Sequence, residues 1–225
     1  FLLETCQDPL QIKAALHALN DTAPHIPIMV SVTIELSGTM LIGTDALTIA
    51  AILSPFNILS LGFNCGTGPK QVHKHVKTLS EVCRFPISVH SNAGLPQNRG
   101  GVTYYPMQPD EFTALQKEFL NINGVAFLGG CCGTTPAHIE ALAKAVENEV
   151  PLKPCGFLKA SLASPFSFSV FDSVPTSCFQ IHCPVSWLNI PTEQNRLPFT
   201  ISYFFCQFNC PTTESNISIS TLASL

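Results

Sequence analysis

Cysteines directly follow two apolar runs of the chain. Cys131 and Cys132 lie side by side between glycines in "VAFLGGCCGTTP", and Cys65 holds an equivalent position in "ILSLGFNCGTGP". In parallel α/β folds, ligands bind at the carboxyl ends of strands, so the three sulfurs can meet there. Three protein ligands and one open position are typical of a catalytic zinc site, and sulfur favours zinc over magnesium or calcium.

Spacing alone leaves other roles open for these residues. A single cysteine at a strand end is commonly a small core residue, and an adjacent pair can be a redox couple or two buried thiols. The ten cysteines lie in apolar runs and glycine turns of a long chain, which favours a reducing compartment over a disulfide framework. Two further pairs near the C-terminus, Cys178/Cys183 and Cys206/Cys210, suggest a metal knuckle only loosely.

Strand and helix patterns alternate up to about residue 150. Short apolar runs predict buried strands at 1–4, 26–34, 58–63, 86–90 and 125–128. Helical patterns lie between and after them, at 8–19, 68–82, 108–120 and 134–146, with a weaker one at 43–53. Asp8 and Thr135 are the expected N-caps of two of these helices, each followed by proline.

Alternation of this kind predicts βα units and a parallel sheet. A closed barrel has eight such units. The five units here match the last five of a (β/α)8 TIM-type barrel, with the first strand already under way at residue 1. An open five-stranded α/β domain is the alternative.

Composition changes after residue 150. Residues 151–225 are rich in Ser, Phe, Pro and Cys, carry few charges and keep neither the helical nor the strand period. We therefore predict two regions, an α/β unit at 1–150 and an irregular, poorly structured tail at 151–225.

Charge and hydropathy exclude several classes of partner. A net charge of −4 argues against nucleic acid and against an anionic membrane surface. No apolar run of 18 residues is present to span a bilayer, and "FLLETCQDPL" lacks the basic region of a signal peptide. A cytoplasmic location is expected.

Five motifs carry a resemblance to a known family. In chain order they are "LLETCQDPLQIKAAL", "GTMLIGTD", "LGFNCGTGP", "SNAGLP" and "GGCCGTTPAHI". Together, over about residues 1–149, they resemble the homocysteine-binding domains of cobalamin-dependent methionine synthases. The wider family includes betaine- and S-methylmethionine-dependent homocysteine methyltransferases.

The resemblance implies a (β/α)8 barrel with Zn²⁺ bound by three cysteines. Residue by residue, it assigns Cys65, Cys131 and Cys132 as the zinc ligands, Glu4 as the group that binds the substrate ammonium, and Asn92 as a neighbour of the zinc. No catalytic residue beyond this site is implied. One departure concerns the loop at Asn92, where Ser91 replaces the family's usual proline.

The implied reaction is methyl transfer to the thiol of homocysteine, giving methionine. Methylcobalamin would be the donor, carried by a cobalamin-binding module that is absent here, as is the folate-binding module. Because the first three strands are also absent, we expect impaired activity. A non-catalytic zinc- or thiol-binding fragment and an inert truncated product are the alternatives.

Several other polar residues are given structural roles. His73 and His75 are expected in solvent on a charged helix, His90 as a hydrogen-bonded core histidine and Glu35 as a loop carboxylate in water. Cys6 and Cys83 are expected to be core thiols. The glycines after Cys65 match no strong phosphate-binding motif.

Overall fold

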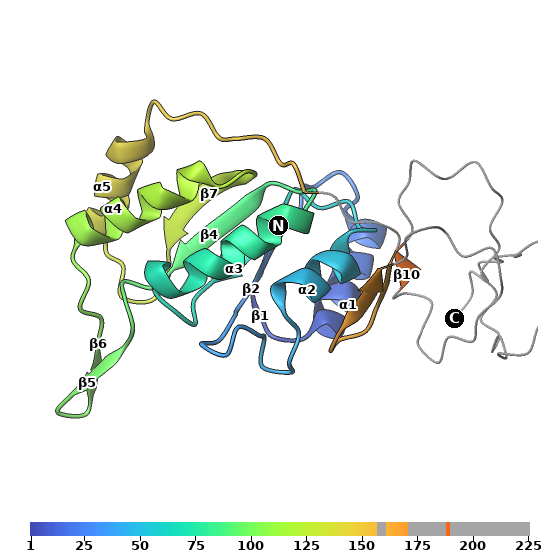
Figure 1. Ribbon diagram of the computed structural model, residues 1–225, viewed down its shortest axis with the longest axis horizontal. Helices are drawn as coiled ribbons and strands as arrows, with labels where there is room; N and C mark the ends of the chain where they lie inside the picture. The colour runs from blue at the N-terminus through green and yellow to red at the C-terminus, as the bar shows by residue number, and fades with distance from the viewer. Residues whose placement is uncertain (157–160, 171–187, 190–225) are drawn as a thin grey trace, which may run out of the picture.

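The computed structural model describes residues 1–156, 161–170 and 188–189. Strands alternate with helices along most of this length (Figure 1). The main sheet consists of β1 (Leu2–Cys6), β2 (Met29–Val32), β3 (Ser60–Asn64), β4 (Ile87–Ser91) and β7 (Val125–Gly130). The helices are α1 (Pro9–Thr22), α2 (Ala46–Leu53), α3 (Pro69–Val82), α4 (Pro109–Glu118), the 3-10 helix η1 (Phe119–Asn121) and α5 (Pro136–Val146).

The main sheet is parallel throughout, in the order β1-β2-β3-β4-β7. Alternate strand residues, among them Val30, Leu61 and Ile87, are fully buried in a core shared with α1, α2 and α3. A smaller cluster joins α4 to α5. The mixed α/β class with a five-stranded parallel sheet, predicted from the sequence, is thus confirmed. Within the described residues, β1 and β7 each pair on one side only.

Local signals begin the helices where the sequence places them. Asp8 caps α1, accepting a hydrogen bond from the Leu10 N–H at 2.8 Å, and Thr135 is the N-cap of α5. The weaker pattern at 43–53 forms α2, which Asp45 caps by accepting from the Thr48 N–H at 2.8 Å. This helix is buried on nearly every side, so its sequence lacks the polar face that marks the other helices.

Small and polar residues alternate with the apolar core residues along the strands. Ser31, Asn64 and Ser88 are each almost fully buried on the opposite side of the sheet from the helices. Gly62 belongs to the same set, because an added Cβ would lie only 1.9 Å from the Ser88 carbonyl oxygen. The absence of a side chain at Gly62 therefore allows β3 and β4 to approach closely on this inner face.

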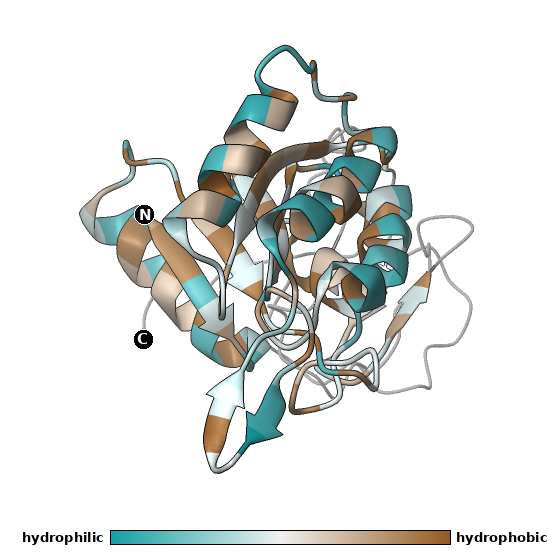
Figure 2. Cartoon of the chain, turned by 90° about the vertical axis from the view of Figure 1, so that its left-hand side faces the viewer, coloured by the Kyte–Doolittle hydropathy of each residue, from teal (hydrophilic) through white to brown (hydrophobic). Residues whose placement is uncertain are grey.

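Two hairpins were not predicted. One is β5 (Gln97–Arg99) with β6 (Val102–Tyr104), which projects from the body of the molecule (Figures 1 and 2). Its two-residue Gly100–Gly101 turn is a recognised hairpin signal. The other joins β8 (Ser161–Ala163) to β9 (Phe168–Val170), and β10 (Leu188–Asn189) pairs with β8.

The β8–β9 hairpin lies within the region predicted as an irregular tail. Its Ala163 is buried in the main core, and Phe168 packs against the same core. Regular secondary structure is therefore also present beyond residue 150, in this hairpin. The paired cysteines at 178, 183, 206 and 210 lie outside the described residues. Among the described helices, none is both long and apolar enough to cross a membrane.

Candidate metal and substrate site

The structure brings Cys65, Cys131 and Cys132 together. Cys65 follows β3 and the cysteine pair follows β7, so all three lie at the carboxyl edge of the sheet. Their sulfur atoms lie within 4.8 Å of one another, and the Cys65 and Cys132 sulfurs are 3.5 Å apart. All three side chains are partly exposed, so a metal ion and a ligand can both reach them.

Left-handed backbone turns aim these sulfurs at one point. Cys65 itself has φ +58° and Gly66 has φ +67°, where an added Cβ would lie 2.5 Å from the Ile34 carbonyl oxygen. Gly133, with φ +78°, ends the second turn. Glycine is therefore required beside the cysteines, because side chains at these positions would be strained or would collide.

Backbone hydrogen bonds join the two cysteine turns through the loop after β4. The Asn92 side-chain oxygen accepts from the Cys132 N–H at 3.0 Å, and the Asn92 N–H donates to the Thr67 carbonyl at 3.1 Å. The Cys131 N–H donates to the Ser91 carbonyl at 2.9 Å. Asn92 is nearly fully buried and spans the two turns, so it fixes one relative to the other.

Electrostatics distinguish this cluster from three ordinary thiols. Burial, and to a smaller extent the neighbouring sulfurs of Cys65 and Cys132, raise the pKa of Cys131 from 9.0 to about 12. Three thiolates so close together repel one another unless a cation lies among them. A divalent cation would supply the compensating positive charge. Three sulfur ligands are a donor set that favours zinc.

Glu4 lies at the edge of the sheet, on β1. Its carboxylate is exposed and not among the groups that cluster with the sulfurs, but it raises the pKa of His90 against the larger lowering effect of burial. The His90 carbonyl in turn accepts from the Cys65 N–H at 3.1 Å. The effect of Glu4 on His90 therefore places its carboxylate near β4, the strand next to the first cysteine turn.

Asn64 connects Glu4's strand to the first cysteine. Its side-chain oxygen accepts from the Thr5 N–H at 3.0 Å and from the Ser31 hydroxyl at 2.6 Å. Its side-chain N–H donates to the Thr5 hydroxyl at 2.8 Å. Thr5 has φ +56°, an unusual conformation for a β-branched residue, and these bonds stabilise it. Sequence reasoning did not single out Asn64.

Tyr105 is a second residue that the sequence did not single out. It follows the β5–β6 hairpin and lies against the second cysteine turn, 2.3 Å from where a Gly133 Cβ would be. Partial burial raises its pKa, and its interactions with Cys132 and with the nearby sulfurs of Cys65 and Cys131 raise it further. The Gly100–Gly101 turn is the one sequence signal that could have indicated this region.

The remaining candidates lie away from the sulfurs. His73 and His75 are half-buried rather than solvated as predicted, because His73 packs on Phe119 with ring centroids 5.3 Å apart and His75 lies against Gly38. Both line a cavity of about 480 Å³ together with Glu35, which accepts from Gln7 at 3.3 Å. The two isolated thiols, Cys6 and Cys83, are half-buried and buried.

Comparison with known proteins identifies the class. The profile of the homocysteine S-methyltransferase family matches residues 1–146, and the chain belongs to this family.

Relatives within that class include the methionine synthases of Mycobacterium leprae (strain TN), 44% identical over 149 residues, and Mycobacterium tuberculosis (strain ATCC 25618 / H37Rv), 42% identical over 151 residues. These matches cover 64% and 65% of this chain but only 12% and 13% of the relatives. The resemblance recognised in the motifs is thus confirmed.

A solved structure shows the same fold. The oxidized form of the homocysteine methyltransferase MmuM from Escherichia coli superposes with a TM-score of 0.52 at 24% identity. The match covers 64% of this chain and 44% of that one.

Proposed function

We propose that residues 1–150 form a zinc-dependent homocysteine-binding unit for methyl transfer to the homocysteine thiol. The observation that carries this proposal is the convergence of three cysteine sulfurs from two strand ends to within 4.8 Å. Family membership supports the substrate. The proposed unit ends close to the end of the family match at residue 146.

Cys65, Cys131 and Cys132 would hold the zinc ion. The fit rests on the donor set, because three soft sulfurs share one small volume, where burial and the neighbouring sulfurs raise the pKa of Cys131. Zinc supplies the charge that keeps a coordinated thiol deprotonated at neutral pH.

Residues around the cluster would position both the zinc ion and the homocysteine. Asn92 holds the two cysteine turns together, and Asn64 fixes the left-handed turn at Thr5 that directs Glu4. The Glu4 carboxylate would accept charge-assisted hydrogen bonds from the homocysteine ammonium. Its exposure leaves it free to do so, and the three cysteines would keep the site electron-rich for a thiolate nucleophile.

The sheet is proposed to be five strands of a (β/α)8 barrel. Both edge strands are open among the described residues, and the buried hydroxyls of Ser60 and Ser88 on the inner face have no hydrogen-bond partner there. Further strands would supply hydrogen-bond partners for the edges of β1 and β7 and for these two hydroxyls.

Methylcobalamin is the proposed donor, because methionine synthases are among the relatives that the chain matches. It would be carried by a separate cobalamin-binding module, next to a folate-binding one. Betaine or S-methylmethionine is the alternative donor. A non-catalytic zinc- or thiol-binding unit is the second candidate function, because the three-cysteine cluster can hold a metal whether or not Glu4 takes part.

Metal analysis tests the central claim. The chain purified with zinc should contain about one zinc per molecule, and Cys65→Ser, Cys131→Ser and Cys132→Ser should each lower this content. Cys155→Ser is the matched control, since Cys155 is an exposed thiol outside the cluster. Undiminished zinc in a variant lacking all three cysteines of the cluster would refute the proposal.

A further inference from the structure

Tyr105 is packed against the turn that carries the cysteine pair. Its Cβ and Cγ lie 2.3 Å from the position of a Cβ added at Gly133. The absence of a side chain at Gly133 is therefore what allows the tyrosine to lie there. Tyr105 also packs against the small core formed by Ala93, Met107, Phe112 and Leu142.

The backbone around Tyr105 is fixed to the same turn. The Met107 N–H donates to the Ala93 carbonyl at 3.1 Å, and the Ala93 N–H donates to the Cys132 carbonyl at 2.9 Å. The Met107 carbonyl is also hydrogen-bonded, at 3.0 Å, to the buried ring of His138 on α5, the helix that follows the cysteine pair. The backbone next to Tyr105 is therefore fixed both to the cysteine turn, through Ala93, and to the helix that follows it, through His138. The hairpin before Tyr105, in contrast, projects from the body of the molecule (Figure 1).

We propose that Tyr105 is a positioning residue of the metal centre, whose hydroxyl donates a hydrogen bond to the Cys132 sulfur. The inference rests on the proposed metal site. Cys132 is partly exposed, and its backbone N–H is already bonded to Asn92. The tyrosine hydroxyl would therefore supply a second, separate restraint, on the side chain.

A bond of this kind has two consequences for the sulfur. It fixes the side-chain orientation in which Cys132 faces Cys65, 3.5 Å away. It also withdraws electron density from the thiolate, because the donor stabilises the sulfur lone pairs. Groups that hold metal ligands in this way commonly change metal affinity by 10–100-fold when removed. Tyr105 is only half-buried, so we expect the lower end, roughly tenfold.

The test compares Tyr105→Phe with Tyr104→Phe in the full chain. Both variants keep the aromatic ring and lose one hydroxyl, but the Tyr104 ring lies under Arg99, at 4.1 Å from the guanidinium carbon to the ring centroid. Zinc affinity is measured by competition with a chromophoric chelator. The sulfur-to-metal charge-transfer band is measured on the cobalt-substituted protein.

Tyr105→Phe should weaken zinc binding about tenfold and move the charge-transfer band to lower energy, while Tyr104→Phe matches the wild type in both. Equal affinities and bands in the wild type and both variants would overturn the role of Tyr105 but leave the proposed metal site standing. A weaker affinity with an unchanged band, or equal losses in both variants, would show a structural effect of the hairpin and would overturn it too. Failure of the wild type to bind zinc or cobalt would overturn the proposed function as well.

Discussion

Asn64 offers a direct test of how the fold positions the site. It is almost fully buried, and its side chain makes three hydrogen bonds, two to Thr5 and one to Ser31. Asn64→Ala removes all three bonds at once. The Thr5 N–H, the Thr5 hydroxyl and the Ser31 hydroxyl would then lose these partners in a partly buried environment.

The expected cost follows from these contacts. A net value of about 1 kcal/mol for each hydrogen bond gives about 3 kcal/mol of lost stability. Relaxation of the left-handed Thr5 would return part of this, since that conformation is itself unfavourable for a β-branched residue. We therefore predict that Asn64→Ala lowers the free energy of unfolding by about 2–3 kcal/mol.

Urea unfolding monitored by circular dichroism measures this change, and zinc affinity is measured in parallel. Zinc binding should weaken as well, because Cys65 directly follows Asn64 and itself has a left-handed backbone conformation, with φ +58°. Asn98→Ala is the matched control: Asn98 makes one bond, to the Gly101 N–H on the exposed hairpin, and should cost less than about 1 kcal/mol. Equal losses in the two alanine variants would refute the reasoning.

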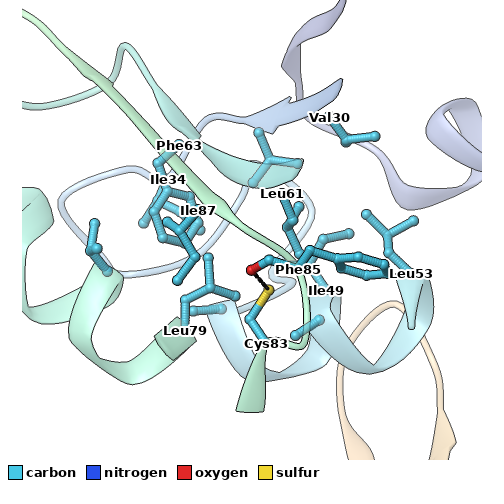
Figure 3. Close-up of a cluster of buried hydrophobic side chains, with 14 of the residues drawn as sticks. Val30, Ile34, Ile49, Leu53, Leu61, Phe63, Leu79, Cys83, Phe85 and Ile87 are labelled. Carbon is cyan, nitrogen blue, oxygen red and sulfur yellow. Dashed lines mark hydrogen bonds between the residues drawn. The ribbon is translucent and has the colours of Figure 1, made fainter. Parts of the chain in front are cut away.

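Two further predictions concern Cys83 and Glu4. Burial raises the pKa of the Cys83 thiol, which bonds to the Phe85 carbonyl (Figure 3), from 9.0 to about 11. Its contribution to stability should therefore be complete below pH 9 and fall by up to about 2.7 kcal/mol as the pH rises to 11. Cys83→Ala should lack this component in urea unfolding between pH 8 and 11, and an unchanged pH dependence would contradict the assignment. For Glu4→Gln, we predict unchanged zinc content and roughly tenfold weaker homocysteine binding by calorimetry of the zinc-loaded protein. Equal binding by both proteins would remove Glu4 from the site, and no binding by either would favour the non-catalytic fragment.

Sequence patterns predicted most of the secondary structure because the relevant signals are local. Proline follows the N-cap of α1 and of α5, and all five apolar runs coincide with strands. Burial was predicted correctly for β2, β3 and β4, but the edge strands β1 and β7 are largely half-buried or exposed, because each pairs on one side only among the described residues. The main disagreement, at His73 and His75, has a tertiary cause. The α3 sequence looks polar on that side, but Phe119 and the loop at Gly38 cover it.

The supporting residues of the site could not be predicted in the same way. Asn64 acts on Thr5, which lies 59 positions away, and Tyr105 acts on a turn that begins 26 positions later. Asn64 lies within the motif "LGFNCGTGP", but its partner is set by the pairing of β1 with β2 and of β2 with β3. Tyr105 has no periodic or motif signal, and its partner is set by the path of the hairpin. Only the sheet order makes these contacts visible.

The side-by-side cysteines have a simple geometric explanation. On a regular strand, consecutive side chains point to opposite faces, so Cys131 and Cys132 could not share a ligand there. The strand β7 ends at Gly130, and the chain then turns through Gly133 at φ +78°. Departure from strand geometry at the cysteine pair lets both sulfurs face Cys65. Because Gly133 in this turn has no side chain, Tyr105 can occupy the space where a Cβ of residue 133 would lie. A single glycine therefore serves both the convergence of the sulfurs and the approach of the residue proposed to hold Cys132.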